Sequence, residues 1–166
     1  MTVTEQLHPD LTAEGGTPRT LLRLRPEVEV TAQGDDLELS HPWGRQRVHA
    51  LGAETVQRLA ALTRTHLDVD ELADGGRLFH LLSRFPYLVT TTIADPLGEP
   101  MATAVPIARA AGLPGLVRAP ASVVLSRFAY LRRLPEEHAG ACVLESPMAP
   151  FRLTLHQPAA GPSSRR

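Results

Sequence analysis

The apolar residues in the first third of the chain follow a period of two. They alternate with polar residues from Leu22 to Val30, from Leu37 to Ser40 and from Arg45 to Ala50, and turn sequences separate the three runs. Alternation of this kind is typical of half-buried strands, and Gly or Pro between the runs marks hairpins. The pattern predicts three antiparallel strands at the start of the domain.

The apolar spacing then changes to that of helices. Val56, Leu59 and Leu62 recur at helical intervals and predict an amphipathic helix. Asp68 with Glu71 resembles a capping box and predicts the start of a second, short helix. A third helix is expected to end before the proline at position 86, because the residue before a proline disfavours the helical conformation.

Strand-like runs return after the helices. Residues 87–107 form a predicted hairpin around Asp95–Gly98, and residues 122–156 contain three further runs, of which Phe151–Leu155 alternates most regularly. Three strands, three helices and a hairpin are the element order of a winged-helix-like unit. We therefore expect an α+β fold, in which a winged-helix-like unit is followed by a three-strand antiparallel β segment.

The same pattern predicts the domain boundaries. Pro, Gly and polar residues without apolar periodicity predict disordered ends and a linker. The expected organisation is a disordered tail at 1–20, a winged-helix-like domain at 21–108, a linker at 109–121, an antiparallel β unit at 122–157 and a disordered tail at 158–166. The β unit corresponds to an incomplete second winged-helix-like unit, since no helical pattern follows it.

Composition narrows the classes of function. Aromatic residues make up 4% of the chain, so we expect an aliphatic core, and the net charge of −1 gives no overall basic field for nucleic acid or an anionic membrane. The lone Cys142 lies in an apolar run and indicates an inert thiol. Neither a secretory signal pattern nor a membrane-length apolar run occurs, so we expect a cytoplasmic protein.

No self-contained active site follows from the motifs. The seven histidines lack the paired spacing of metal ligands, so no metal is expected. The serines lack a nucleophile-elbow context, and no glycine-rich phosphate loop occurs. The adjacent carboxylates Asp35–Asp36 and Glu136–Glu137 fall in predicted turns. The protein is therefore expected not to be catalytic on its own.

Basic residues on a predicted edge strand and on the third helix leave three interpretations. A winged-helix transcriptional regulator would place the third helix in DNA, although the protein lacks a basic field. Peptide capture would add an extended segment to the edge strand beside this helix. In the third interpretation, the arginines only solubilise an exposed edge. The candidate peptide-binding residues are Arg45, Arg47, His49, Arg77, His80 and Arg84.

Three motifs in the last part of the chain resemble a known family. They are V-V-L-S-R-F-A-Y-L-R-R at Val123–Arg133, V-L-E-S-P-M-A at Val143–Ala149 and F-R-L-T-L-H at Phe151–His156. These motifs are similar to the N-terminal, non-catalytic, winged-helix-like region of SagB-type peptide azoline dehydrogenases. The segments Leu22–Val48 and Tyr87–Ile107 agree with the same region.

The resemblance implies a role in the biosynthesis of azole-containing, ribosomally made peptides. The family oxidises thiazolines and oxazolines with FMN, in a nitroreductase-like domain that uses a lysine–tyrosine pair. This chain has no lysine and is expected to end before such a domain. The resemblance therefore implies an accessory or peptide-recognition subunit without a cofactor, whose partners are a precursor peptide, an FMN-containing dehydrogenase subunit or a second copy. The alternative is a truncated, inactive SagB-type dehydrogenase.

The incomplete β unit also predicts an interface. Its strands carry apolar residues that would face water unless a partner subunit or a second copy covered them. The expected interface residues are Val123, Leu125, Phe128, Tyr130, Phe151 and Leu153.

Overall fold

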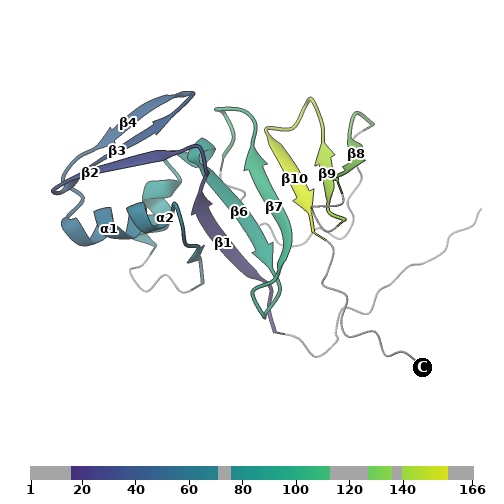
Figure 1. The fold of residues 1–166 in the computed structure, drawn as a ribbon, viewed down its shortest axis with the longest axis horizontal. Coiled ribbons are helices and arrows are strands. Elements are labelled where there is room, and N and C mark those ends of the chain that lie inside the picture. The colour runs from purple at the N-terminus through teal and green to yellow at the C-terminus, as the bar shows by residue number, and fades with distance from the viewer. Residues whose placement is uncertain (1–15, 71–75, 113–126, 136–139, 157–166) are drawn as a thin grey trace, which may run out of the picture.

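The structure is a computed structural model that describes residues 16–70, 76–112, 127–135 and 140–156. In these residues the chain is mostly β, with a seven-stranded sheet, a three-stranded sheet and two short α-helices (Figure 1). The helices are α1 (Ala53–Ala61), α2 (Arg77–Leu82) and the 3₁₀ helix η1 (Pro86–Leu88). The strands are β1 (Arg19–Leu24), β2 (Glu29–Gln33), β3 (Asp36–His41), β4 (Gly44–Val48), β5 (Leu67–Asp68), β6 (Val89–Ala94), β7 (Pro100–Pro106), β8 (Tyr130–Arg133), β9 (Cys142–Glu145) and β10 (Phe151–Leu155).

The small sheet is an antiparallel meander in the order β2-β3-β4. Gly34 and Asp35 connect β2 to β3, and Gly34 has a φ of 60°, a left-handed conformation that glycine adopts without strain. Pro42 and Trp43 connect β3 to β4. Alternate residues of β3 are buried, so one face of the small sheet packs on the core and the other faces solvent.

The large sheet has the order β5-β1-β6-β7-β10-β9-β8, and each neighbouring pair is antiparallel. Strand β10 pairs with β7 from Phe151 opposite Pro106 to Leu155 opposite Ala102. The strands of segment 122–157 therefore extend the sheet that the hairpin β6–β7 belongs to, as Figure 1 shows.

The expected α+β fold with a winged-helix-like unit of three helices is wrong, because the described residues are mostly β and contain only the α-helices α1 and α2. Where the second helix was predicted to begin, Asp68 lies in β5 and pairs with Leu21 of β1. Its buried carboxylate accepts hydrogen bonds from Arg19 Nε at 2.6 Å and from the Asp70 amide at 2.9 Å. The residue that resembles a helix cap thus anchors a strand, because tertiary pairing outweighs local propensity. Glu71 lies outside the described residues.

The first predicted strand, 22–30, is divided between the two sheets. Residues before Pro26 form β1 of the large sheet, and residues after it form β2 of the small sheet. The Val28 amide donates to the Arg25 carbonyl at 3.0 Å and closes the corner. Proline suits this corner because it fixes φ and has no amide hydrogen that needs a partner.

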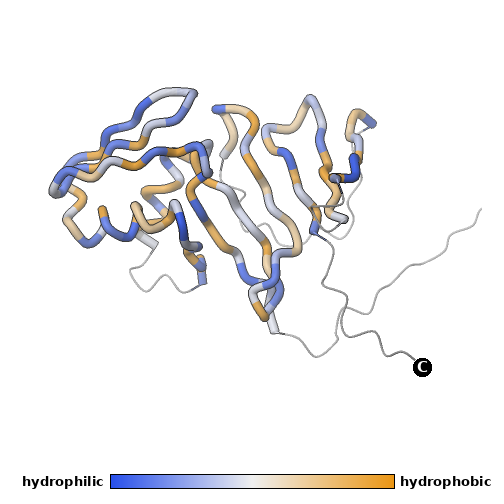
Figure 2. Tube along the Cα trace, viewed as in Figure 1, coloured by the Kyte–Doolittle hydropathy of each residue, from blue (hydrophilic) through white to orange (hydrophobic). Residues whose placement is uncertain are grey.

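The hydrophobic core lies between the small sheet, the helices and the strands β1 and β6. Figure 2 shows apolar and polar positions alternating along the strands, as expected for sheets that are buried on one face. The core is aliphatic except for one tyrosine. Its buried residues are Leu22, Leu24, Val28, Leu37, Leu39, Val56, Leu59, Leu62, Leu78, Leu82, Tyr87, Leu88 and Val89.

The side chain of Arg25 joins the two sheets. Its Nη1 donates to the Pro106 carbonyl at 3.1 Å and to the Tyr87 carbonyl at 3.5 Å, and its guanidinium lies 4.9 Å from the centroid of the Trp43 ring. Trp43 lies in the β3–β4 turn of the small sheet, and Pro106 ends β7 of the large sheet. We call Arg25, Trp43, Tyr87 and Pro106 the Arg25 joint.

Replacing Arg25 with methionine is expected to lower the free energy of unfolding by about 2–3 kcal/mol. Hydrogen bonds from a charged donor contribute about 1.5–3 kcal/mol and a cation–π contact about 0.5–1 kcal/mol, whereas methionine keeps much of the apolar stem. Urea titration followed by circular dichroism measures the change. Arg64→Met, at an exposed position, is the matched control and is expected to stay within about 0.5 kcal/mol of the unsubstituted protein. An equal effect of both substitutions would contradict the role given to Arg25.

Candidate functional site

Strand β4 is the outer strand of the small sheet and pairs only with β3 among the described strands. The two-residue turn makes His41 and Gly44 a hydrogen-bonded pair, and such pairs recur at every second position of an antiparallel ladder. Arg45 and Arg47 occupy the positions in between. Their amide and carbonyl groups are therefore directed to the open edge of the sheet.

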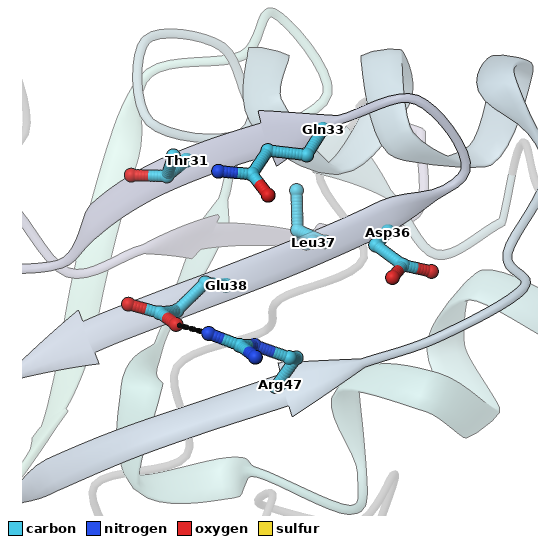
Figure 3. Close-up of a pocket in the computed structure, with 6 residues that line it drawn as sticks. All are labelled: Thr31, Gln33, Asp36, Leu37, Glu38 and Arg47. Carbon is cyan, nitrogen blue, oxygen red and sulfur yellow. Dashed lines mark hydrogen bonds and ion pairs between the residues drawn. The ribbon is translucent and has the colours of Figure 1, made fainter.

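An ion pair and a histidine–carboxylate hydrogen bond lie at the solvent face of this sheet. Arg47 Nη2 is 2.7 Å from Glu38 Oε2, and this hydrogen bond lowers the pKa of Glu38 below its ordinary value (Figure 3). His49 Nδ1 is 2.8 Å from Asp36 Oδ2. The pKa of Asp36 is lowered first by this hydrogen bond from His49 and then by the Ala50 amide, which donates at 3.1 Å. The pairs hold Arg47 and His49 over the sheet.

Two hollows indent the same face. A depression of about 190 Å³ crosses β2, β3 and β4, and all but one of its lining residues are polar: Thr31, Gln33, Asp36, Leu37, Glu38 and Arg47 (Figure 3). A second hollow of about 450 Å³ lies beside it and includes Arg45 with Glu27 and Glu29. Arg45 is exposed and forms no ion pair within the described part of the chain.

The sequence predicts that the third helix, here α2, flanks this edge. Val48 of β4 lines a small apolar cavity together with Leu81 of α2 and Phe85, which follows α2. His80 and Arg84 are exposed, and the side chain of Arg77 lies outside the description. The structure thus brings Arg45, Arg47 and His49 together on one strand and its extension. His80 lies in α2 and Arg84 follows it, and within the described residues no hydrogen bond or ion pair joins them to Arg45, Arg47 or His49.

The residues of the predicted interface lie on different faces of the large sheet. Leu153 pairs with Leu144, and Leu144 pairs with Leu131, so the three share one face. Tyr130 lies on the other face, where its hydroxyl donates to Glu145 Oε2 at 2.8 Å. Phe151 shares the face of Leu153, and Phe128 is exposed beside the guanidinium of Arg127 at 4.7 Å. Val123 and Leu125 lie outside the described residues.

Sequence reasoning missed a further polar pocket on the large sheet. Arg23 of β1, Thr103 of β7, and two histidines from loops, His66 and His156, line it. These residues are far apart in the sequence and meet only through the strand order β1-β6-β7-β10. The available signal was the alternation of β1, which places Arg23 on the face opposite to its buried neighbours.

The described residues contain no group of three or more His, Cys, Asp or Glu side chains placed to hold a metal ion. Cys142 is half-buried and its Sγ lies 4.0 Å from the Gly140 carbonyl. None of the helices in the described ranges is long and apolar enough to cross a membrane.

Comparison of the sequence with protein-family models and with curated proteins finds no match.

A fall in pH is expected to lower the stability of the small sheet, because Asp36 and Glu38 become protonated. Because their pKa values are lowered from 3.8 and 4.5, their contribution to stability is present above these values and is lost as the pH falls through the lower folded-state values. The double variant Asp36→Asn, Glu38→Gln should therefore show a shallower loss of unfolding free energy below about pH 5. Urea titrations across this range measure the slope, with Asp35→Asn in the exposed turn as control. An unchanged slope in the double variant refutes the prediction.

Proposed function

We propose that this protein is a non-catalytic accessory subunit that recognises a peptide and acts with an FMN-dependent azoline dehydrogenase. The pathway would be the biosynthesis of azole-containing, ribosomally made peptides. The motifs at Val123–Arg133, Val143–Ala149 and Phe151–His156, which resemble SagB-type dehydrogenases, support the pathway. The open edge of β4 supports peptide recognition.

The orientation of the β4 backbone is the main support for peptide binding. An exposed edge can accept an extended peptide as an additional strand, and the main-chain hydrogen bonds then supply affinity whatever the peptide sequence. Arg45 and Arg47 direct their amide and carbonyl groups outward, while their side chains stay on the solvent face with Glu38.

Docking of the dehydrogenase is proposed at the other end of the large sheet. Leu131 of the outermost strand β8 is 61% exposed, and it continues an apolar row with Leu144 and Leu153. Leu144 and Leu153 are half-buried, so the row ends in one exposed leucine, and exposed apolar surface of this kind can serve as a subunit contact. A second copy of this chain is the competing occupant of the same face. The proposed location is the cytoplasm, where ribosomally made peptides are first available.

The role of the β4 edge can be tested with two substitutions at one position. Arg47→Pro and Arg47→Ala both remove the ion pair with Glu38, but only proline also removes the outward amide, and proline is tolerated at edges. With a fluorescein-labelled precursor peptide of an azole-forming pathway, Arg47→Pro is expected to weaken binding at least about tenfold relative to Arg47→Ala. Fluorescence anisotropy gives both affinities. Equal affinities would exclude main-chain pairing at this edge.

The protein purified alone is expected to be colourless, because FMN is proposed to lie in the partner. Mixed with an FMN-containing SagB-type azoline dehydrogenase, it should form a complex that size-exclusion chromatography resolves. Leu131→Glu should weaken this complex at least about tenfold, since it buries a charge. Leu97 is 88% exposed in the turn between β6 and β7, and Leu97→Glu should not change the affinity of the complex. Tightly bound FMN in the protein alone contradicts the proposal, as does an equal effect of both substitutions.

A further inference from the structure

A pocket of about 340 Å³ lies on the face of the large sheet that is turned away from the core. Leu22 and Leu24 of β1 are buried in the core, so the intervening Arg23 is directed to the opposite face. Thr92 of β6 pairs with Thr103 of β7, which places both hydroxyls on this face. We call this pocket the Arg23 pocket.

All ionisable residues that line the Arg23 pocket are bases. Among the residues that the structure describes, they are Arg23, His66 and His156, and no Asp or Glu of this part of the chain lines the pocket. The two hollows on the small sheet differ, because each includes two carboxylates. Arg23 therefore gives the pocket one permanent positive charge, and each histidine adds a further positive charge when it is protonated.

The guanidinium of Arg23 has no counter-ion in the described ranges. Its Nη2 donates to the Thr63 carbonyl at 2.9 Å, which fixes its position, while its Nε is buried without a hydrogen-bond partner. Other arginines differ in this respect: Arg19 pairs with Asp68, and Arg152 lies 3.9 Å from Glu145. A fixed, partly buried cation without a carboxylate favours an anionic ligand.

His66 senses the same charge. Partial desolvation, followed by repulsion from Arg23, lowers the pKa of His66. Two basic groups thus lie close enough to repel each other, in a pocket whose described lining residues include no carboxylate. A negative group placed between them would relieve this repulsion and stabilise the protonated imidazole.

A chain of polar groups fixes the other side of the pocket. Thr92 Oγ1 lies 3.1 Å from Thr103 Oγ1, which lies 2.9 Å from His156 Nε2. Because Nε2 is occupied, Nδ1 is the His156 nitrogen left for a ligand. The pocket therefore combines a fixed guanidinium, two imidazoles and positioned hydroxyl groups on one floor.

The other residues that line the Arg23 pocket are mostly apolar. Together with the volume of the pocket, they indicate which class of anionic ligand would fit. A volume of about 340 Å³ exceeds that of an inorganic ion and lies in the range of small-molecule pockets. A single arginine without a glycine-rich turn suits one carboxylate better than a phosphate group, which commonly uses several backbone amides. We propose that the Arg23 pocket binds a small organic carboxylate. Its charged end lies among Arg23, His66 and His156, and its carbon chain lies on Leu21, Pro26 and Pro100.

The test uses hexanoate, inorganic phosphate and hexylamine as probes at constant ionic strength. The imidazole resonances of His66 and His156 report binding in nuclear magnetic resonance titrations of the full chain. Hexanoate is expected to shift both resonances saturably, phosphate to bind at least about tenfold more weakly, and hexylamine not to bind. A non-saturable response to hexanoate, or tighter binding of phosphate or hexylamine, overturns the proposal.

Substitutions locate the carboxylate. Arg23→Gln is expected to weaken hexanoate binding at least about tenfold, since it removes a charge-assisted hydrogen bond. Arg152→Gln, on the same sheet face and near Glu145, is the matched control and should leave the affinity unchanged. If Arg23→Gln does not fold, His156→Gln replaces it and is expected to weaken binding by a factor of about five. Unchanged affinity in the folded variant refutes the site, and the β4 edge is unaffected by this result because it belongs to the other sheet.

Discussion

The contact of Arg25 with both sheets determines how the surfaces of this protein are arranged. Its guanidinium holds the Pro106 and Tyr87 carbonyls and lies over Trp43, so one side chain fixes the large sheet, η1 and the small sheet relative to each other. The chain turns at Pro26 directly after this residue and leaves one sheet for the other. Together with the shared hydrophobic core, the Arg25 joint therefore holds the open edge of β4 and the Arg23 pocket in fixed positions.

At and beside the Arg25 joint, two buried polar groups lack a hydrogen-bond partner among the described residues. His41 accepts a hydrogen bond from the Trp43 amide at 3.1 Å, but its Nε2 is buried without a partner, as is the Tyr87 hydroxyl. Burial, followed by the charge of Arg25, lowers the pKa of His41, which favours the neutral imidazole. Unpaired buried groups reduce stability, so aromatic stacking and the aliphatic core must offset them.

The sequence pattern predicted the strands whose formation depends on residues close together in the chain. Alternation located β3, β4 and β10 and placed Arg45 and Arg47 on an exposed strand, because one buried face imposes a period of two. The alternation pattern failed where the structure depends on residues far apart in the sequence. Asp68 is a strand residue that binds Arg19, and β10 pairs with β7, from which a long segment of the chain separates it. The Arg23 pocket was unpredictable for the same reason. Positions 23, 66, 103 and 156 come together only after the strand order is set.

The continuity of the large sheet has a consequence for the proposed function. Because β10 pairs with β7, strands β8, β9 and β10 belong to the same sheet as β6 and β7, and Figure 1 shows β4 and β8 at opposite ends of the molecule. A peptide on the β4 edge and a dehydrogenase on the face of Leu131 would not compete for surface. The sheet and the Arg25 joint would then hold the peptide at a fixed distance from the enzyme, which favours delivery over simple capture.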